Sequence, residues 1–507
     1  MLNIFWLKPL PLTTQCYKIA ATFQALRFIF WNGVDNLGLT MIILSLVLLI
    51  FFAYRGYSII FIAPLFAVVA SIGSGHDPMP VFSEIYMTKA AEYVKTYYPV
   101  FLLGAIFAKI MEEGGLAASV ANKIVQTLGK EKAILAILIG CGVLTYGGLS
   151  VFVVAFVMYP FAAILFKQAN YPKKLLPGLL WMGIFTYSMV AIPGTPQIQN
   201  IIPTAYFGTT TWAGIGLGLI GAVLYFAMAW GWVNYRAKKL QAAGEGYGTN
   251  LQNEPEVSKE ELPDWKLSSI PLVMVIVLNL FISNPFNWSW AYHWDQSSLD
   301  SLAGLNLSLL AGGVGKVQAI WSINAALILS CIAAALIGRK CLASKGGVVH
   351  PINTGAVGSM AAILNVASCY AFGCVVAAVP AFEMIKEALL GISIGDGPLG
   401  SAVITTLIMC GITGSASGGE TIALGMLGEQ WLTMANQIGM NPEVLHRIVA
   451  LASECIDTPP HSGALITLMA VCGLSHKESY YDVFVLTLLK TSVAFICLAI
   501  FAVTGIV

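Results

Sequence analysis

Apolar segments, each close to the length of a membrane-crossing helix, follow one another from residue 38 to the end of the chain. A helix needs roughly 20 apolar residues to cross the hydrocarbon core of a bilayer. Of the 507 residues, 58% are hydrophobic and only 10% are charged, whereas soluble domains carry about 25% charged residues. The sequence therefore predicts an all-α polytopic protein that spans the plasma membrane (the inner membrane in a bacterium) many times.

Strings rich in Gly, Ser and Pro interrupt four of these apolar segments. They are TYGGLS (145–150), IPGTPQIQN (192–200), TGSASGGE (413–420) and ECIDTPPHSG (454–463). Non-helical backbone at membrane depth is tolerated only where protein buries it or where it lines a cavity. Broken helices of this kind form the substrate and ion sites of secondary transporters, so we expect these four strings to form the working centre of the protein.

The two halves of the chain repeat the same order of features. A shift of 270 residues places TYGGLS (145–150) on SASGGE (415–420), since 415 − 145 = 270. Each half is predicted to contain three spans, a re-entrant hairpin (132–167 or 398–435), a broken transmembrane helix and a last span. Placing the Lys- and Arg-rich loops in the cytoplasm makes the two hairpins enter from opposite sides. The sequence thus predicts two inverted repeats, an arrangement found in many secondary transporters.

Hydrophilic stretches set the predicted domain boundaries and loops. The longest is rich in Gly, Asn, Glu and Pro and is predicted to be a cytoplasmic linker between the repeats. A second polar stretch, 74–94, is predicted to be a loop. The predicted organisation is 1–37 as an N-terminal arm, 38–237 as the first transmembrane repeat, 238–265 as the linker and 266–507 as the second transmembrane repeat.

Polar groups at the interruptions are the candidate substrate ligands. We expect no lysine or arginine deep in the membrane to bind an acidic substrate. Lys490 is the nearest exception, and its long side chain is expected to reach the inner interface. Free N–H groups at the starts of half-helices favour anions, and hydroxyl and amide groups supply further donors. The predicted substrate-binding residues are Gly148, Ser150, Thr195, Gln197, Ser415, Ser417, Thr421, Thr458 and Ser462.

Ionisable residues occur only in the interruptions of the second half. Glu420, Asp457 and His461 are therefore the candidates for ion or proton coupling. Structural roles remain open for each of them: Glu420 as a cap of the following helix, Asp457 as an acceptor for freed backbone N–H groups, and His461 as a hydrogen-bonded structural residue. Close helix packing is the corresponding alternative for the small Ser and Gly residues.

Other functional classes have less support in the sequence. No GxSxG or HExxH motif is present, so an intramembrane enzyme is not expected. The ten cysteines show no CxxC spacing, and we expect no metal and no cofactor. A net charge of +1 gives no indication of nucleic-acid binding. Two alternatives stay open, which are Na⁺ coupling through carbonyls and hydroxyls, and a passive anion channel or facilitator.

Several strings resemble the gluconate:proton symporter (gluconate permease-like) family of the ion-transporter superfamily. They are YGGLSVFVVAFVMYPF (146–161), PGTPQ (193–197), DTPPHSGA (457–464) and GLSHKESYYD (473–482). The resemblance implies proton symport of a small organic acid, such as a sugar acid or hydroxy acid. It also implies a homodimer with an elevator-like motion.

The chain also departs from that family's pattern. Gluconate permeases carry an acid inside the first hairpin and a His-containing, Pro-rich string in the first broken helix. This chain has Ser150 and PGTPQ (193–197) at those places, and its acid and histidine lie in the second half. A smaller monocarboxylate such as a hydroxybutyrate is therefore as consistent with the resemblance as gluconate is.

Overall fold

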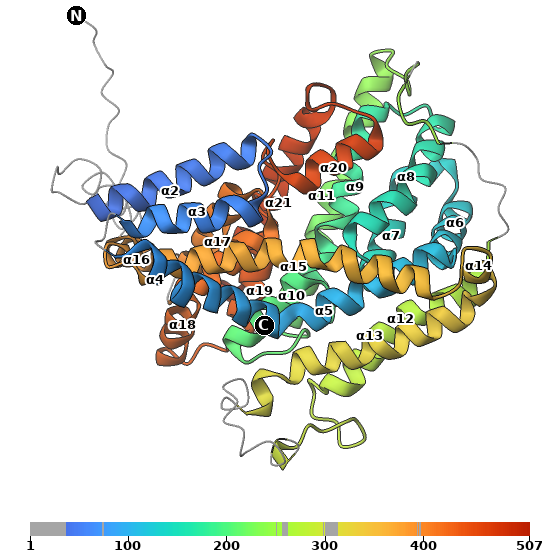
Figure 1. The fold of residues 1–507 in the computed structure, drawn as a ribbon. Coiled ribbons are helices and arrows are strands. Elements are labelled where there is room, and N and C mark those ends of the chain that lie inside the picture. Colours follow the sequence, from blue (N-terminus) through green and yellow to red (C-terminus); the bar gives the residue numbers. More distant parts are fainter. Residues whose placement is uncertain are drawn as a thin grey trace, which may run out of the picture.

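A computed structural model describes the protein at residues 37–72, 76–249, 251–255, 262–297, 299, 313–392, 394 and 397–507. Every element within these residues is a helix, and eight of the helices are long and apolar enough to cross a membrane. The prediction of an all-α, multi-pass membrane protein is confirmed (Figure 1). The predicted N-terminal arm lies almost entirely outside the described residues.

The first half begins with long helices and ends with a hairpin, a broken helix and a final span. Its elements are α2 (Leu37–Tyr54), α3 (Ile59–Ile72), α4 (Pro78–Pro80), η1 (Val81–Met87), α5 (Thr88–Glu113), α6 (Leu116–Leu128), η2 (Lys130–Lys132), α7 (Ala133–Tyr146), α8 (Val151–Gln168), η3 (Lys173–Leu175), α9 (Leu176–Ile184), η4 (Tyr187–Ala191), α10 (Ile198–Phe207) and α11 (Ile215–Ala242).

The second half follows the same order of elements. They are α12 (Trp265–Ser283), η6 (Val314–Lys316), α13 (Gln318–Ile337), α14 (Arg339–Ser344), α15 (Val349–Ala378), α16 (Phe382–Leu390), α17 (Leu399–Thr413), α18 (Ala416–Gln437), α19 (Pro442–Ser453), α20 (Gly463–Cys472) and α21 (His476–Thr504). In each half a hairpin precedes a broken helix, and the inversion between the halves stays a prediction.

The prediction of a polar loop over 74–94 was wrong. Residues 78–113 are helical without interruption. Asp77 has extended backbone and Pro78 is the first helical residue, a position that proline favours because its fixed φ suits the start of a helix. Polar residues in this segment therefore belong to an extension of α5 beyond its apolar part.

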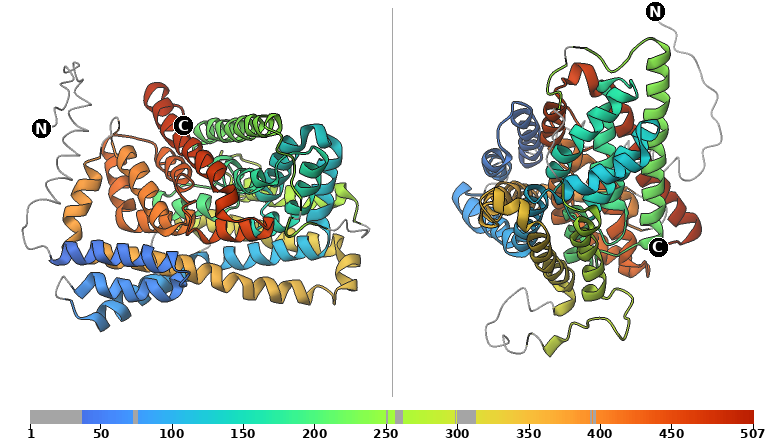
Figure 2. Two further views of the ribbon diagram at one scale, coloured as in Figure 1. Left: turned by 90° about the horizontal axis from the view of Figure 1, so that it is seen from above. Right: turned by 90° about the vertical axis from the view of Figure 1, so that its right-hand side faces the viewer.

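The helices form two layers. The long helices α5 and α15 run side by side, α3 packs against α15, α13 packs against α5, and α2 packs against α3. This layer lies along the lower edge of the left-hand view in Figure 2. In that view the hairpins and the broken helices lie above this layer, and α18 packs against α15. The long-helix layer therefore supports the elements that contain the four interruptions.

Each hairpin consists of a shorter first helix and a longer second helix, joined at a glycine with left-handed backbone. Gly148 has φ +95° at the tip of the α7–α8 hairpin, and Gly414 has φ +60° at the tip of the α17–α18 hairpin. Glycine adopts such φ values without steric cost. The arms of the second hairpin are in close contact, since a Cβ on Gly419 would lie 2.3 Å from the Cα of Cys410. The helical hairpins predicted from the sequence are therefore present.

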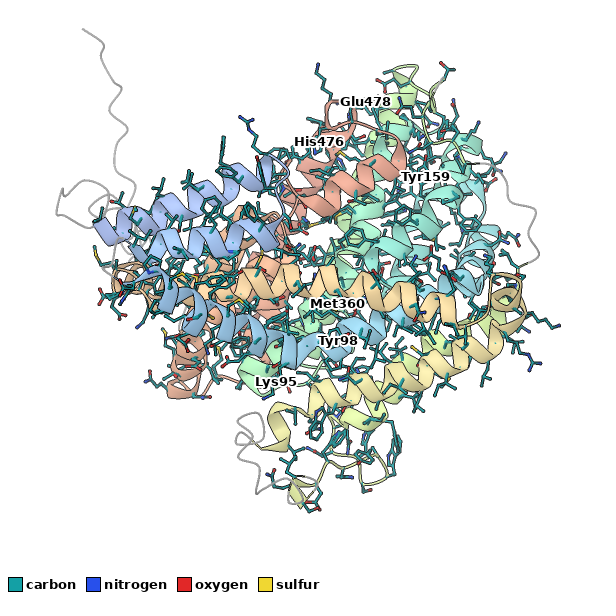
Figure 3. All side chains as sticks on the ribbon, in the orientation of Figure 1. Lys95, Tyr98, Tyr159, Met360, His476 and Glu478 are labelled. Atoms are coloured by element: carbon teal, nitrogen blue, oxygen red, sulfur yellow. The ribbon has the colours of Figure 1, made fainter. Side chains whose placement is uncertain are left out.

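The linker between the halves is anchored to both of them at residues that the structure describes. The carbonyl of Asn253 accepts a hydrogen bond from Tyr159 of α8 at 2.6 Å, and its side chain donates to the Ala470 carbonyl of α20 at 2.8 Å. Glu254 pairs with Lys173 at 2.9 Å. Burial opposes ionisation of Glu254, but the hydrogen bond from Lys173 helps to hold its pKa below the usual value. Figure 3 shows Tyr159 at the end of the molecule where α20 lies.

The close contact at Gly419 predicts a position that tolerates no larger side chain. Overpacking typically costs about 1–3 kcal/mol, and here the added atom would meet rigid backbone. We expect Gly419→Ala to destabilise the protein despite the ~1 kcal/mol that alanine gains over glycine in a helix. Thermal unfolding of the purified protein in detergent measures this effect. Gly463→Ala is the matched control, because nothing lies within 4 Å of a Cβ at Gly463. Equal stability of the two variants would contradict the packing argument.

Candidate functional site

The two hairpins and the two broken helices meet in one region. Helix α10, which follows the first break, packs against α18 and α19 of the second half. Helix α19 also packs against η4, the last helical turn before the first break. Figure 1 shows α10, α18 and α19 together on the same side of α15. Tertiary packing therefore brings the interruptions of both halves to a common region in the second layer.

The first break is bonded to the tip of the first hairpin. The side-chain amide of Gln197 donates to the carbonyls of Thr145 at 2.7 Å and Leu149 at 3.0 Å. The hydroxyl of Tyr146 donates to the Pro193 carbonyl at 2.8 Å. A Cβ on Gly148 would lie 3.3 Å from Pro196, so a larger residue would be crowded there. Gln197 thus binds the first break to two backbone carbonyls at the hairpin tip.

The second break meets the tip of the second hairpin in a similar way. His461 donates from Nε2 to the Ile412 carbonyl at 3.1 Å, near the end of α17. A Cβ on Gly414 would lie 3.1 Å from His461 and from the Cα of Ser462. Each hairpin tip is therefore joined to the break of its own half by a side chain that bonds backbone, an amide in the first half and an imidazole in the second.

The remaining hydroxyl candidates fall into three groups. Thr195 donates to the Ser188 carbonyl at 2.8 Å, Thr421 donates to the Ser417 carbonyl at 2.6 Å, and the hydroxyl of Thr458 bonds that of Thr487. Their hydroxyls are engaged locally in this conformation. The half-buried candidates are Ser150, at the start of α8, and Ser415 and Ser417, at the start of α18. Ser462 is different, because its buried hydroxyl has no hydrogen-bond partner among the described residues.

Glu420 is fully buried, and neither of its carboxyl oxygens has a hydrogen-bond partner within the described parts of the chain. It does not cap α18, because Ser415 does so by accepting a hydrogen bond from the Gly418 N–H at 3.2 Å. Tyr93 and Tyr97 of α5 lie close to its carboxyl group. The capping alternative is therefore wrong, and Glu420 is a buried acid whose carboxyl oxygens have no hydrogen-bond partner among the residues that the structure describes.

Asp457 forms a buried ion pair with Lys490 of α21. The ammonium group of Lys490 also lies 5.3 Å from the ring centre of Trp181, within cation–π range. The expectation that Lys490 reaches the interface was wrong. Lys490 is 14 residues from His476 and 14 from Thr504, the two ends of α21. That distance is about 21 Å, more than a lysine side chain can span.

A second buried cation, Arg447, was missed by the sequence reasoning. Its guanidinium group donates to the Val190 carbonyl at 2.5 Å and to the Ala213 carbonyl at 3.0 and 2.6 Å. Val190 lies in η4, immediately before the first break. A cation stabilises the freed carbonyls at the end of a helix. The first break therefore lies beside a positive charge that the second half supplies.

Glu454 is the other functional candidate that the sequence reasoning missed. It is the residue that ends α19, and its side chain is fully buried. Its carboxyl group lies near Asp457, Lys490 and Glu420. The string 454–463 begins with this residue, so the sequence did contain a signal for it. Among the described residues, no group of three or more His, Cys, Asp and Glu is arranged to hold a metal ion.

Comparison of the sequence with known proteins identifies a relative of this chain. The chain is 42% identical over 484 residues to the "Uncharacterized transporter YxjC" of Bacillus subtilis (strain 168), and the match covers 92% of this chain and 100% of that protein. The chain belongs to the same transporter family. No family model matches the sequence. The relationship supports a transport role rather than catalysis, and the resemblance to the gluconate permeases in particular stays a prediction.

Solved structures provide a comparison of the fold. The YdaH transporter of Alcanivorax borkumensis, whose topology was described as unusual, superposes with a TM-score of 0.54 at 12% identity, over 83% of this chain and 88% of that one. MtrF of Neisseria gonorrhoeae, described with a class of antimetabolite efflux pumps, superposes with a TM-score of 0.49 at 15% identity, over 94% and 97% of the two chains. The fold of this chain is thus similar to that of YdaH.

The buried pair predicts a large effect when one partner is removed. Lys490→Met would leave Asp457 buried and unpaired, and breaking such a pair costs about 3–5 kcal/mol. We expect much of this loss to be recovered in the double variant Lys490→Met/Asp457→Asn, because neither charge then remains. Chemical unfolding in detergent would measure both variants.

The exposed Lys477, on the first turn of α21, provides the control substitution Lys477→Met. A single Lys490→Met variant as stable as Lys477→Met would show that the pair contributes nothing to the folded state.

Proposed function

We propose that this protein is a secondary active transporter that carries a small organic acid together with protons. Membership of a transporter family supports transport in general. The observation that favours proton coupling is Glu420, a fully buried carboxyl group without a hydrogen-bond partner in the described structure.

The physical argument concerns the cost of burying charge. An ionised carboxylate without a partner is very unfavourable away from water, so such a group binds a proton instead. Glu420 lies in the fifth position of α18, directly beyond the tip of the second hairpin. A movement that brings this hairpin into contact with water would allow the proton to leave. Glu420 would then bind and release one proton in each transport cycle, with Asp457 and His461 as further coupling groups.

The proposed substrate site lies between the hairpin tips and the breaks. Helices α10 and α20 both begin at a break, and their first N–H groups favour an anion. Ser462, at the start of α20, adds a buried hydroxyl that has no partner in the part of the chain described. The other residues proposed to bind the substrate are Gly148, Ser150, Thr195, Gln197, Ser415, Ser417, Thr421 and Thr458.

The charges in the region favour a small substrate with one carboxylate. Lys490 is paired with Asp457, and Arg447 is bonded to backbone carbonyls, so both cations already have partners in this conformation. N–H and hydroxyl donors match a hydroxy acid or sugar acid such as a hydroxybutyrate or gluconate. A homodimer embedded in lipid, as the resemblance implies, completes the proposal, which includes no cofactor and no nucleic acid.

Uptake into liposomes tests this function. We expect the purified protein to accumulate labelled gluconate or 3-hydroxybutyrate when a pH gradient is imposed. A proton gradient of one pH unit supports roughly tenfold accumulation for each proton carried. Glu420→Gln is expected to abolish accumulation and to retain substrate exchange, because glutamine mimics the protonated acid but cannot release a proton.

Three comparisons make the result decisive. Glu429→Gln is the matched control, since Glu429 lies on the same helix and is exposed. A sodium gradient without a pH gradient tests Na⁺ coupling, and equilibration without accumulation under either gradient would identify a passive facilitator. Normal pH-driven accumulation by Glu420→Gln would contradict the role proposed for this residue.

A further inference from the structure

Glu454 lies at a place where a carboxyl group is difficult to explain as structure alone. It ends α19 and begins the second break. Its side chain is fully buried, and its carboxyl group lies against that of Asp457. No other hydrogen-bond partner of its oxygens lies in the described parts of the protein. Two buried carboxyl groups in contact cannot both be ionised without a large cost, so this acid pair at a helix break indicates a functional group.

The groups around Glu454 come from every element packed near it. Asp457 and Cys455 lie on the same break, and Lys490, Glu420, Cys410 and Tyr225 lie on α21, α18, α17 and α11. The thiols and the phenol make their hydrogen bonds to backbone carbonyls. The ionic neighbours that remain are two acids and one ammonium group, and the ammonium group is already paired with Asp457.

The charge balance of this cluster requires bound protons. Glu420, Glu454 and Asp457 would carry three negative charges if all were ionised, and Lys490 supplies one positive charge, which would leave 3 − 1 = 2 charges uncompensated. Uncompensated charges are strongly disfavoured in a buried environment. In the present conformation the ion pair accounts for Asp457, and the other two carboxyl groups are the ones that hold protons.

We propose that Glu454 and Asp457 compete for Lys490, and that this competition makes Glu454 a second proton-releasing group of the transporter, beside Glu420. The O–H bond of Glu454 breaks and its proton passes to water on one side of the membrane. The ammonium group then moves from Asp457 to the Glu454 carboxylate, and Asp457 takes up a proton from water on the opposite side of the membrane. When the ammonium group returns to Asp457, that proton passes to Glu454 and the starting state is restored. The net charge of the cluster is unchanged, and Lys490 stays protonated throughout.

The geometry suits such an exchange. Glu454 and Asp457 are three residues apart on the same non-helical segment, whereas Lys490 is fixed in the middle of α21 between that segment and Trp181. A small displacement of the break along α21 would bring a different carboxylate to the same ammonium group. This inference rests on the proposed proton coupling and extends it to a residue and a partner exchange.

Transport by Glu454→Gln tests the inference, with Glu429→Gln as the control and with labelled gluconate and 3-hydroxybutyrate as probes. We expect Glu454→Gln to exchange substrate as the control does, and to lose the roughly tenfold accumulation that one proton supports at a difference of one pH unit. Normal accumulation by Glu454→Gln would overturn the inference. A variant that loses both exchange and accumulation would also overturn the inference, because Glu454 would then serve the substrate site or the fold.

An infrared measurement separates this inference from the proposed function, because it needs no substrate. A protonated carboxylic acid has its own carbonyl stretching band, and the purified wild type should show one such band that Glu454→Gln lacks. Absence of that band from the wild type would overturn the inference even if pH-driven transport occurs. If the wild type shows the band but accumulates neither acid, the proposed function fails while the protonation of Glu454 stands.

Glu454→Asp is the second variant, for use if Glu454→Gln does not fold. It keeps the carboxyl group but shortens the side chain by one methylene, so the carboxylate reaches less far toward Lys490. We expect it to retain an acid band at a shifted position and to accumulate substrate less than the wild type. Accumulation equal to that of the wild type, with an unshifted band, would overturn the inference.

Discussion

A charge that is buried away from water must be compensated by other groups of the protein, and the centre of this transporter depends on that constraint. Asp457 and Lys490 compensate each other inside the protein. The pair fixes the second break to the middle of α21, and Trp181 of α9 covers the ammonium group. Removing either partner would leave the other charge uncompensated. The position of the break, and of the hairpin that contacts it, therefore depends on one electrostatic contact.

Side chains that bond backbone have a similar role elsewhere in the centre. Gln197 and His461 each join a hairpin to the break of the same half. Arg447 bonds carbonyls on both sides of the first break, although it belongs to the second half. Non-helical backbone in a membrane must satisfy its polar groups within the protein. The four interruptions are consequently held together as one unit, which is a suitable basis for a concerted movement.

Much of this arrangement could be predicted because apolar spans and helix-breaking strings are clearly distinct patterns in the sequence of a membrane protein. Hydropathy identified the long helices, and the clusters of Gly, Ser and Pro identified both hairpins and both breaks. The polar segment 74–94 was misassigned because polar residues can extend a helix beyond the apolar part, and proline at Pro78 begins a helix instead of ending one. Composition alone does not show whether polar residues form a loop or extend a helix.

The charged residues of the centre show where prediction from sequence fails. Glu420 and Asp457 were recognised because each lies within or beside a helix-breaking string. Lys490 and Arg447 lie in regular helices, where a basic residue is indistinguishable from one that reaches the interface. Their partners are far away in the sequence, 33 residues for Lys490 and 257 for the contact of Arg447 with Val190. Only folding shows that these side chains point inward.

The sequence by itself determined that the chain is a helical membrane protein with hairpins and broken helices, because apolar length and helix-breaking residues act locally along the chain. The tertiary structure decided which acids are paired. It paired Asp457 with Lys490, placed the Glu454 carboxyl group against that of Asp457, and left Glu420 without a partner among the described residues. That difference arises from the packing of α18, α19 and α21, and it is the physical reason why two carboxyl groups in this cluster are candidates to carry protons.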